Sequence, residues 1–292
     1  MWPLMPLKSK HTGSMQVVRK KDMHVVTIPV SGEQNTNYCL LLSDLHWDNP
    51  GCDRRLLKKH LDLAIERNAS IFIFGDLFCA MQGKYDPRGS KSSIRAEHNV
   101  PNYLDALVDT AVEWFKPYAQ NIALITPGNH ETSILRRLET DLTERLAQGL
   151  GVHRGNYAGW VMLMFRRTKT SQVNKLLSYH HGYGGGGPVT KDVIQASRKA
   201  VYLPDADIVV SGHTHDRWIF PIQRVRITKF GNQSLEEQLH LKLGTYKDEY
   251  LGGNGWAIER GMPPKATGGV WLRAEYRRDT NDYKIDLTAE LA

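Results

Sequence analysis

Long apolar runs are missing from this chain. Among its 292 residues, uninterrupted apolar runs such as Ile71–Phe74 and Ile122–Ile125 are far shorter than the roughly 20 residues that cross a bilayer. The N-terminus has no basic start followed by an apolar stretch, so we expect no secretory signal peptide. Hydrophobic residues make up 41% and charged residues 24%, which is ordinary for a soluble globular protein. We therefore expect no membrane partner.

Cysteine is scarce as well. The chain has three cysteines, at positions 39, 52 and 79, and this odd and widely spaced set argues against a disulfide framework. Such cysteine usage is typical of a reducing compartment, so we expect a cytoplasmic protein. Repeats and low-complexity tracts are absent from the sequence, apart from the short run Gly184–Gly187.

Acidic residues are outnumbered by basic ones. Lys and Arg total 38, Asp and Glu total 31, and the formal net charge is +7. A basic surface suits a polyanionic partner such as nucleic acid. A basic soluble protein without a polymer partner fits the same charge equally well, because net charge is only a loose indicator of partners.

Strand-like and helix-like segments alternate in the first half of the chain, and strands dominate the second half. Helical spacing of apolar residues predicts helices over 57–65, 104–115, 135–146 and 191–202. This order suits a two-sheet α/β sandwich. The predicted strands lie near 39–43, 71–74, 122–125, 160–165, 176–179, 208–210, 217–228, 237–243, 269–276 and 282–288.

The chain is expected to form one main domain. Residues 1–37 are interpreted as an N-terminal lead-in with a candidate edge strand at Val25–Val30, and residues 38–292 as a single domain. Two loops within that domain, 79–100 and 244–268, are candidate covers for a substrate, because long loops beside a site are often functional.

Five short polar motifs follow one another in a fixed order, and four of them come directly after a predicted buried strand. Carboxylate, amide and imidazole groups delivered to one edge of a sheet form a site for two divalent cations. The motifs are Asp44-Leu45-His46, Gly75-Asp76, Gly128-Asn129-His130-Glu131, His180-His181-Gly182 and Gly212-His213-Thr214-His215.

The order of these motifs resembles that of the calcineurin-like metallophosphoesterases, whose pattern runs D-x-H, G-D, G-N-H-D/E, H and G-H-x-H. The match spans roughly positions 40–216. The resemblance implies a sandwich with four layers in the order helix, sheet, sheet, helix. It also implies a hydrolase that cleaves a phosphate-ester substrate with a hydroxide bridging two divalent metal ions.

A shared carboxylate is the usual way to hold two cations about 3.5–4 Å apart, and the resemblance makes Asp76 this bridge. Mixed oxygen and imidazole ligands suit Mn²⁺, with Fe, Zn²⁺, Co²⁺ and Ni²⁺ as alternatives, better than Ca²⁺. No cysteine matches a ligand position, which argues against a thiolate zinc site. The implied ligands are Asp44, His46, Asp76 and His215 for one cation, and Asp76, Asn129, His213 and either His180 or His181 for the other.

The tandem His180-His181 leaves one ligand open. Branches of the family with His-x-Gly or His-x-Pro at this position favour His180, whereas branches with His-Gly favour His181. Neighbouring side chains of a strand point to opposite faces, so only one of the two is expected to face the cations.

Two residues of the third motif are expected to act in catalysis. By resemblance, His130 protonates the leaving alkoxide or stabilises the transition state, a role that suits an imidazole at neutral pH. Glu131 occupies the acidic position of the family pattern, where it is expected either to orient His130 or to cap the helix that begins there.

Candidate substrate contacts lie in two loops. Gly184 and Gly185 follow the fourth motif, and glycine lets backbone N–H groups approach a phosphate closely. A flexible loop without substrate contact is the alternative there. Arg88, Arg95 and His98 lie in the long loop after the second motif, where they are expected to bind a non-scissile phosphate unless the loop is only a solvated basic segment.

Three functions are compatible with these motifs. We expect a phosphodiesterase or nuclease, because the ligand set is full and the chain is basic. Asp76-Leu77-Phe78 resembles the DNA-repair exonuclease branch, although Cys79 stands where some members carry a histidine. The alternative is a small-molecule phosphomonoesterase or cyclic-nucleotide phosphodiesterase at the same site. The third is a non-catalytic scaffold like the retromer subunit of the family, which would require the loss of groups that this chain retains.

Overall fold

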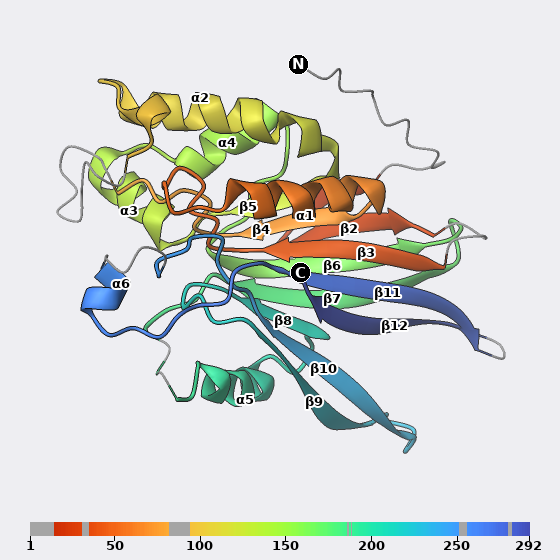
Figure 1. Cartoon of the computed structure of the whole chain (residues 1–292). Coiled ribbons are helices and arrows are strands. Elements are labelled where there is room, and N and C mark those ends of the chain that lie inside the picture. Colours follow the sequence, from red (N-terminus) through yellow and green to blue (C-terminus); the bar gives the residue numbers. More distant parts are fainter. Residues whose placement is uncertain are drawn as a thin grey trace.

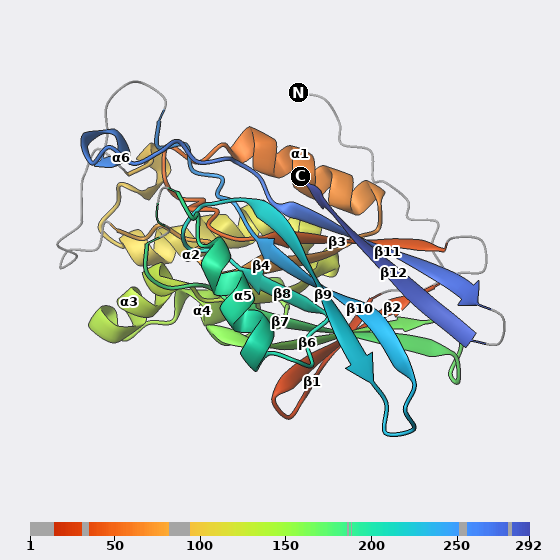
Figure 2. The same ribbon diagram turned by 90° about the horizontal axis from the view of Figure 1, so that it is seen from below.

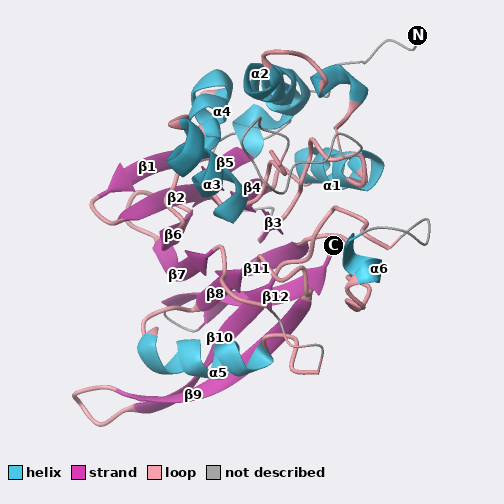
Figure 3. Ribbon diagram, turned by 90° about the vertical axis from the view of Figure 1, so that its left-hand side faces the viewer, coloured by secondary structure: helices cyan, strands magenta, loops and turns pink. Residues whose placement is uncertain are grey.

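Two β-sheets pack face to face in the computed structural model of this chain, and helices cover both outer faces (Figure 1, Figure 3). The structure describes residues 15–30, 35–81, 94–185, 187, 189–250, 256–279 and 282–292. The layers confirm the predicted α/β sandwich. Within the described residues, no helix combines the length and the apolar character needed to cross a membrane.

The five-stranded sheet has the order β12-β11-β3-β4-β5. Three of its strands run parallel, namely β3 (Thr36–Leu42), β4 (Ser70–Phe74) and β5 (Ile122–Thr126). β11 (Val270–Asp279) and β12 (Asp282–Leu291) form an antiparallel hairpin beside β3. Every residue of β4 and β5 is buried, which explains their nearly unbroken apolar sequences, since layers cover both faces of these strands.

The seven-stranded sheet has the order β1-β2-β6-β7-β8-β10-β9 and mixes parallel and antiparallel pairs. β2 pairs in parallel with β6, and β8 pairs in parallel with both β7 and β10. The strands are β1 (Gln16–Lys20), β2 (Met23–Pro29), β6 (Ala158–Arg166), β7 (Gln172–His180), β8 (Ile208–Ser211), β9 (Trp218–Ile227) and β10 (Gln233–Lys242).

Helices and sheets enclose two hydrophobic cores. One core lies between the five-stranded sheet and helices α1 to α4, and the other lies between the two sheets. Figure 2 shows α5 lying across the outer face of the seven-stranded sheet. The helices are α1 (Arg54–Glu66), α2 (Tyr103–Phe115), α3 (Asn129–Leu138), α4 (Leu142–Leu150), α5 (Val193–Tyr202) and α6 (Trp256–Glu259), with short 3-10 segments at Ala96–His98 and Lys116–Asn121.

The candidate edge strand Val25–Val30 forms as β2, but it does not lie at the edge of the sheet. β1 pairs with its outer side after a turn in which Lys21 has a φ of 52°, so β1 takes the edge position. The expectation of an edge position was therefore wrong, although the strand itself is present. The domain boundary predicted at residue 38 stays a prediction.

The single helix predicted over 135–146 is two helices, α3 and α4. The chain leaves α3 at Glu139, whose backbone is left-handed with a φ of 54°. Asp141 then caps α4 by accepting a hydrogen bond from the N–H of Glu144 over 2.9 Å. The apolar spacing continues across the break because both helices pack on the same core.

Candidate metal centre

Loops that follow five strands meet at one edge of the sandwich. β3, β4 and β5 belong to one sheet, β7 and β8 belong to the other, and each leads directly into one of the five motifs. The N–H of His213 donates to Oδ2 of Asp44 over 2.8 Å, and Nδ1 of His181 lies 3.0 Å from the carbonyl oxygen of Phe74. The motifs therefore meet where the two sheets adjoin.

One group of potential ligand atoms comes from Asp44, His46 and His215, and these atoms lie within 4.8 Å of one another. The Nε2 atoms of His46 and His215 are 3.2 Å apart, and Nε2 of His215 is 3.4 Å from Oδ1 of Asp44. This Oδ1 atom is buried and has no hydrogen-bond partner among the described residues. An unpartnered carboxylate oxygen beside two imidazole nitrogens fits a divalent transition-metal ion.

A second group comes from Asp76, His181 and His213, whose ligand atoms also lie within 4.8 Å of one another. Nε2 of His181 is 3.2 Å from Oδ2 of Asp76. Asn129 adds an amide oxygen, which lies 3.1 Å from Nε2 of His181 and 2.7 Å from Nδ1 of His213. The two donor groups are adjacent, because the N–H of His213 contacts Asp44. Their chemistry fits two divalent cations.

The two carboxyl groups are stabilised in their charged form. Burial would raise the pKa of Asp44, but its contact with His215 and the charge of His181 hold that pKa well below its usual value. Burial is likewise outweighed at Asp76, whose pKa is lowered by His181 and His130. Burial lowers the pKa of His181, yet the charge of Asp76 raises it to about 10. The site therefore stabilises positive charge beside both carboxylates.

Backbone strain is concentrated at the same residues. Each left-handed non-glycine residue costs about 1–2 kcal/mol, because its Cβ crowds the following carbonyl oxygen. Strain of this kind persists where the surrounding structure requires side chains to be aimed at one point. The strained residues are Asp44, His46, Asp76, His213 and His215, with φ values of 52°, 45°, 49°, 74° and 58°.

The structure separates the tandem histidines. His181 is fully buried, and its ring faces Asp76 and Asn129. His180 is the last residue of β7, and its Nδ1 accepts a hydrogen bond from the N–H of Gly182 over 2.9 Å. Of the two, His181 joins the donor groups and His180 does not.

His130 lies beside the donor groups with one ring nitrogen fixed. Its Nδ1 donates to the carbonyl oxygen of Cys79 over 2.5 Å, and this nitrogen must carry the hydrogen because a carbonyl can only accept. Its Nε2 lies 3.8 Å from Oδ2 of Asp76, and the side chain is 14% exposed. Nε2 is therefore the atom that a substrate can reach.

Glu131 joins the second and third motifs. Its buried carboxylate accepts hydrogen bonds from the N–H groups of Phe78 and Gly128, each over 2.8 Å, and from that of Asp76 over 3.2 Å. The bond from the N–H of Gly128 satisfies the backbone donor of the N-cap residue at the start of α3. Glu131 thus makes the contacts of the capping alternative, and it positions Asp76 through the backbone.

Comparison with known proteins identifies the family. The sequence model of the calcineurin-like phosphoesterases matches residues 39–217, which is more than half of the chain. The chain belongs to the calcineurin-like phosphoesterase family. Membership confirms the resemblance found in the motifs, and it supports metal-dependent hydrolysis of phosphate esters as the chemistry of this site. No curated protein matches the chain.

Solved structures that match this chain have low sequence identity to it. Vacuolar protein sorting 29 from Cryptosporidium parvum is 16% identical with a TM-score of 0.35, over 89% of this chain and 100% of that one. A proposed 5′-nucleotidase from Staphylococcus aureus is 14% identical with a TM-score of 0.44, over 88% of this chain and 54% of that one. A predicted phosphoesterase from Streptococcus pneumoniae is 12% identical with a TM-score of 0.30, over 88% and 98%. At such scores these similarities support no conclusion about function.

Two of the predicted substrate contacts make hydrogen bonds inside the fold. Arg95 donates from Nε to the carbonyl oxygen of Asn49 over 3.0 Å and from a terminal nitrogen to that of Cys52 over 3.1 Å. His98 is buried, and its Nε2 lies 2.9 Å from Oγ1 of Thr110. The structure does not bring either side chain to the donor groups.

The remaining predicted contacts lie in the two loops. Gly184 and Gly185 are exposed, and a Cβ at either position would meet nothing within 4 Å. Arg88 lies outside the described residues. In the second candidate cover, Tyr246 is fully buried, and its hydroxyl lies 2.6 Å from Nδ1 of His60, so this aromatic side chain belongs to the core.

Two contacts that support Asp44 were missed by sequence reasoning. The hydroxyl of Ser43 donates to Oδ2 of Asp44 over 2.6 Å. The hydroxyl of Thr245 donates to the carbonyl oxygen of Asp44 over 2.7 Å. Ser43 could have been suspected from its place directly before the first motif. Thr245 is 201 residues away from Asp44 along the chain, and no local sequence pattern predicts a contact between them.

Cys79 lies beside the candidate metal centre, although the family pattern has no ligand at this position. Its thiol lies within 4.8 Å of ring nitrogens of His46 and His130, although no cysteine matched a ligand position. Asp48 fixes this segment by accepting hydrogen bonds from the N–H groups of Cys79 and Ala80 over 2.5 and 2.9 Å. Asp48 thereby holds the carbonyl group that binds His130.

Proposed function

We propose that this protein is a dinuclear-metal phosphoesterase that hydrolyses phosphodiesters, with nucleic acid as a candidate substrate. The observation that carries the proposal is the pair of adjacent donor groups, each with one buried carboxylate and two imidazoles. Two divalent cations, when bound, neutralise phosphoryl oxygens and activate the attacking water. Mn²⁺ is the proposed metal, because mixed oxygen and imidazole ligands suit it.

The two donor groups support a division of ligands between the cations. Asp76 is the proposed shared ligand because it occupies the place of the bridging carboxylate in the family pattern, and its Oδ2 lies 3.2 Å from Nε2 of His181 in the second group. The proposed ligands are Asp44, His46 and His215 for one cation, and Asn129, His181 and His213 for the other, with Asp76 between them.

His130 is the proposed general acid. Its Nδ1–H is held by the carbonyl oxygen of Cys79, so the ring cannot turn without losing this bond. Nε2 then faces the carboxylate of Asp76 and the space beside it. As the imidazolium, with a second proton on Nε2, the ring can give that proton to the leaving alkoxide oxygen and keep the one on Nδ1.

Charge and cysteine chemistry support the proposed substrate class and location. The formal net charge of +7 favours association with a polyanion such as a nucleic acid. All three cysteines are free and buried, which supports a reducing compartment, and we propose the cytoplasm.

The first experiment measures hydrolysis of bis-p-nitrophenyl phosphate and of p-nitrophenyl phosphate with added Mn²⁺. We expect the wild type to cleave the diester, and Asp76→Ala and His130→Ala to lose this activity. Only His130→Ala should still bind two equivalents of metal. Cleavage of the monoester alone would make the protein a phosphomonoesterase, and no turnover by the metal-loaded wild type would refute the catalytic proposal.

A second experiment tests the ligand assignment with two neighbouring histidines. Metal content after dialysis should fall from two equivalents to about one in His181→Ala, because this ring lies in a donor group. His180→Ala is the matched control and should keep both, because its ring binds the N–H of Gly182 instead. Loss of metal from the His180 variant alone would overturn the assignment.

A further inference from the structure

Three aromatic rings contact one another in succession beside the candidate metal centre. The ring of Tyr157 lies edge-to-face against that of His181, at a centroid distance of 5.4 Å, and against that of His180, at 5.3 Å. The ring of Tyr183 in turn packs edge-to-face on His180 at 5.6 Å. Tyr157 is partly buried, whereas Tyr183 is 54% exposed. The succession of rings therefore begins at a proposed metal ligand and ends in a ring that a substrate can reach.

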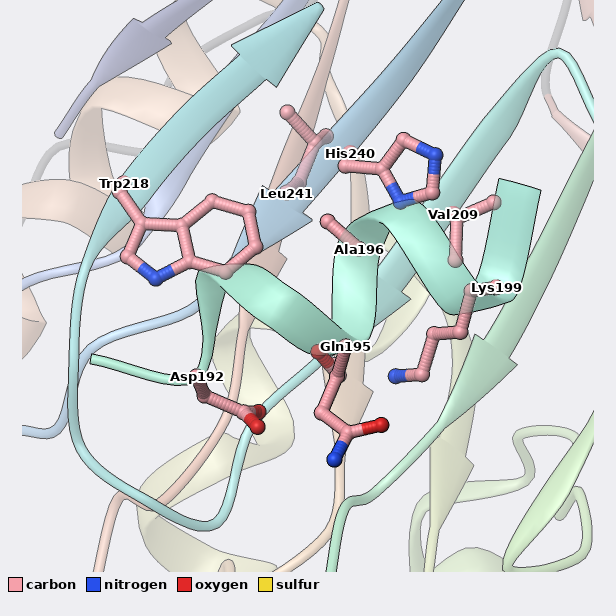
Figure 4. Close-up of a pocket in the computed structure, with 9 residues that line it drawn as sticks. Asp192, Gln195, Ala196, Lys199, Val209, Trp218, His240 and Leu241 are labelled. Carbon is pink, nitrogen blue, oxygen red and sulfur yellow. The ribbon is translucent and has the colours of Figure 1, made fainter. Parts of the chain in front are cut away.

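Tyr183 is held in place although it is exposed. Its hydroxyl donates to Oε1 of Gln195 over 3.3 Å, and Gln195 lies in the first turn of α5 (Figure 4). The main chain before Tyr183 is fixed as well, because the hydroxyl of Tyr157 donates to the carbonyl oxygen of Gly182 over 2.8 Å. A ring that is already oriented loses little freedom when a ligand packs on it, so it binds more tightly than a mobile ring.

The main chain keeps Tyr183 close to the donor groups. Tyr183 follows His181 by two residues, and consecutive Cα atoms are about 3.8 Å apart, so the two Cα atoms lie within about 8 Å of each other. The residue between them packs on a second proposed ligand, because a Cβ on Gly182 would lie 2.6 Å from Cβ of His213. A substrate whose phosphate is bound at the cations therefore brings its neighbouring groups within reach of Tyr183.

The chemistry of this ring selects a flat, aromatic ligand. The hydroxyl hydrogen of Tyr183 is donated to Gln195, so the exposed part that remains for a ligand is the ring itself. A phosphate group is recognised by cations and N–H donors, which a phenol ring does not supply. A nucleobase, in contrast, stacks on an aromatic side chain whatever its sequence identity, because every base has a π-face.

We propose that Tyr183 is a stacking platform for a nucleobase next to the scissile phosphate, which makes single-stranded nucleic acid the substrate class of this centre. The inference rests on the proposed function, because the cations must hold the phosphate that brings the base to Tyr183. A single strand is required because its bases can unstack and pack on an aromatic side chain. His180, which joins neither donor group, is the positioning residue on which the ring of Tyr183 rests.

The experiment compares a labelled oligothymidine with an abasic oligonucleotide of equal length, so that both carry the same number of phosphates. Binding is measured by fluorescence anisotropy with His130→Ala protein loaded with Mn²⁺, which should bind either strand without cleaving it. Adding Tyr183→Ala should weaken binding of oligothymidine about 5–150-fold, the contribution of one stacked base. Binding of the abasic strand should not change, and Tyr183→Phe, which keeps the ring, should bind both strands like the parent protein.

Phe230→Ala is the matched control, because it also removes an exposed aromatic ring. Phe230 is 80% exposed and lies in the turn between β9 and β10. The ten residues of β10 separate this turn from Lys242, which pairs with the last residue of β8, and they span about 30 Å. Phe230→Ala should therefore bind both oligonucleotides like the parent protein.

Cleavage kinetics separate this inference from the proposed function. In protein that retains His130, Tyr183→Ala should raise KM for oligothymidine and leave kcat unchanged, because a base that does not react is bound equally in the ground and transition states. Base-dependent binding without cleavage of any phosphodiester would refute the proposed function and still support the platform. The platform is overturned if the parent protein binds oligothymidine no better than the abasic strand, if Tyr183→Ala weakens binding of both strands equally, or if Phe230→Ala weakens it as much.

Discussion

Gly128→Ala adds one methyl group at the point where the second and third motifs touch, and we predict that it disables the metal centre. A Cβ at this position would lie less than 3.0 Å from Oδ1, the backbone nitrogen and Cγ of Asp76. Alanine would cause no backbone strain at this position, because Gly128 has an extended conformation with a φ of −104° that any residue adopts. The effect of the substitution is therefore steric and falls on the proposed shared ligand.

The magnitude follows from the overlap. Ordinary contacts of a Cβ begin at 3.4 Å, so Asp76 must move by several tenths of an ångström or more. Overpacking of this kind costs about 1–3 kcal/mol of folding stability, and a displacement of about 1 Å at a reacting centre lowers activity about 100-fold. We expect a loss of activity of about 10–100-fold together with weaker Mn²⁺ binding.

Three measurements test this prediction: diester hydrolysis, calorimetric titration with Mn²⁺, and thermal unfolding. Gly185→Ala is the matched control for Mn²⁺ binding and thermal unfolding, because a methyl group there would meet nothing within 4 Å, and in these two measurements it should behave like the wild type. Unchanged Mn²⁺ affinity and unchanged activity in Gly128→Ala would refute the contact between Gly128 and Asp76 on which the reasoning depends.

Three further predictions follow from buried groups. Glu131→Gln should lower the free energy of unfolding of the metal-free protein by about 1.5–3 kcal/mol. The amide nitrogen of the glutamine would have to face a backbone N–H group whose hydrogen bond a carboxylate oxygen accepts in the wild type. The control is Glu113→Gln at an exposed position, which should leave denaturant unfolding unchanged. Burial lowers the pKa of His60 to about 4, below about 6.5 for a free imidazole, so stability should fall as the pH drops from about 6.5 to about 4. His60→Gln should remove up to about 3 kcal/mol of that fall, and an unchanged pH profile would contradict the burial of this ring. Burial raises the pKa of the three cysteine thiols to about 12, so a thiol reagent at pH 8 should label them only in unfolded protein, and rapid labelling of the native state would count against the structure.

The arrangement of the centre could be predicted because its residues follow strands. Ile71–Phe74 reads as a strand from its apolar residues alone, and Asp76 comes directly after it. Parallel strands deliver their carboxyl ends to one edge, so the order of the motifs was enough to predict that they meet. The family pattern supplied the partition of ligands, which stays a prediction; the structure brings potential ligand atoms of Asp44, His46 and His215, and of Asp76, His181 and His213, within reach of one another.

Features that depend on one backbone angle or one distant contact could not be predicted. The choice between His180 and His181 required the end of β7, because one residue of register turns a side chain to the other face. The break between α3 and α4 depends on the left-handed angle of Glu139, which leaves the apolar spacing intact. His98 looked like a surface cation of a loop, but its ring packs on Trp47 at a centroid distance of 5.6 Å.

The donor groups draw on both halves of the sandwich, and this gives the cations a mechanical role. Asp44 and Asp76 follow strands of one sheet, whereas His181, His213 and His215 follow strands of the other. Bound cations would add a cross-link between layers that meet through apolar side chains such as Phe72 and Leu163 and through the hydrogen bond from the N–H of His213 to Asp44. Any substitution that lets one layer slide over the other would spread the ligands apart, so metal affinity reports on the packing of the whole interior and not only on the residues that touch the metal.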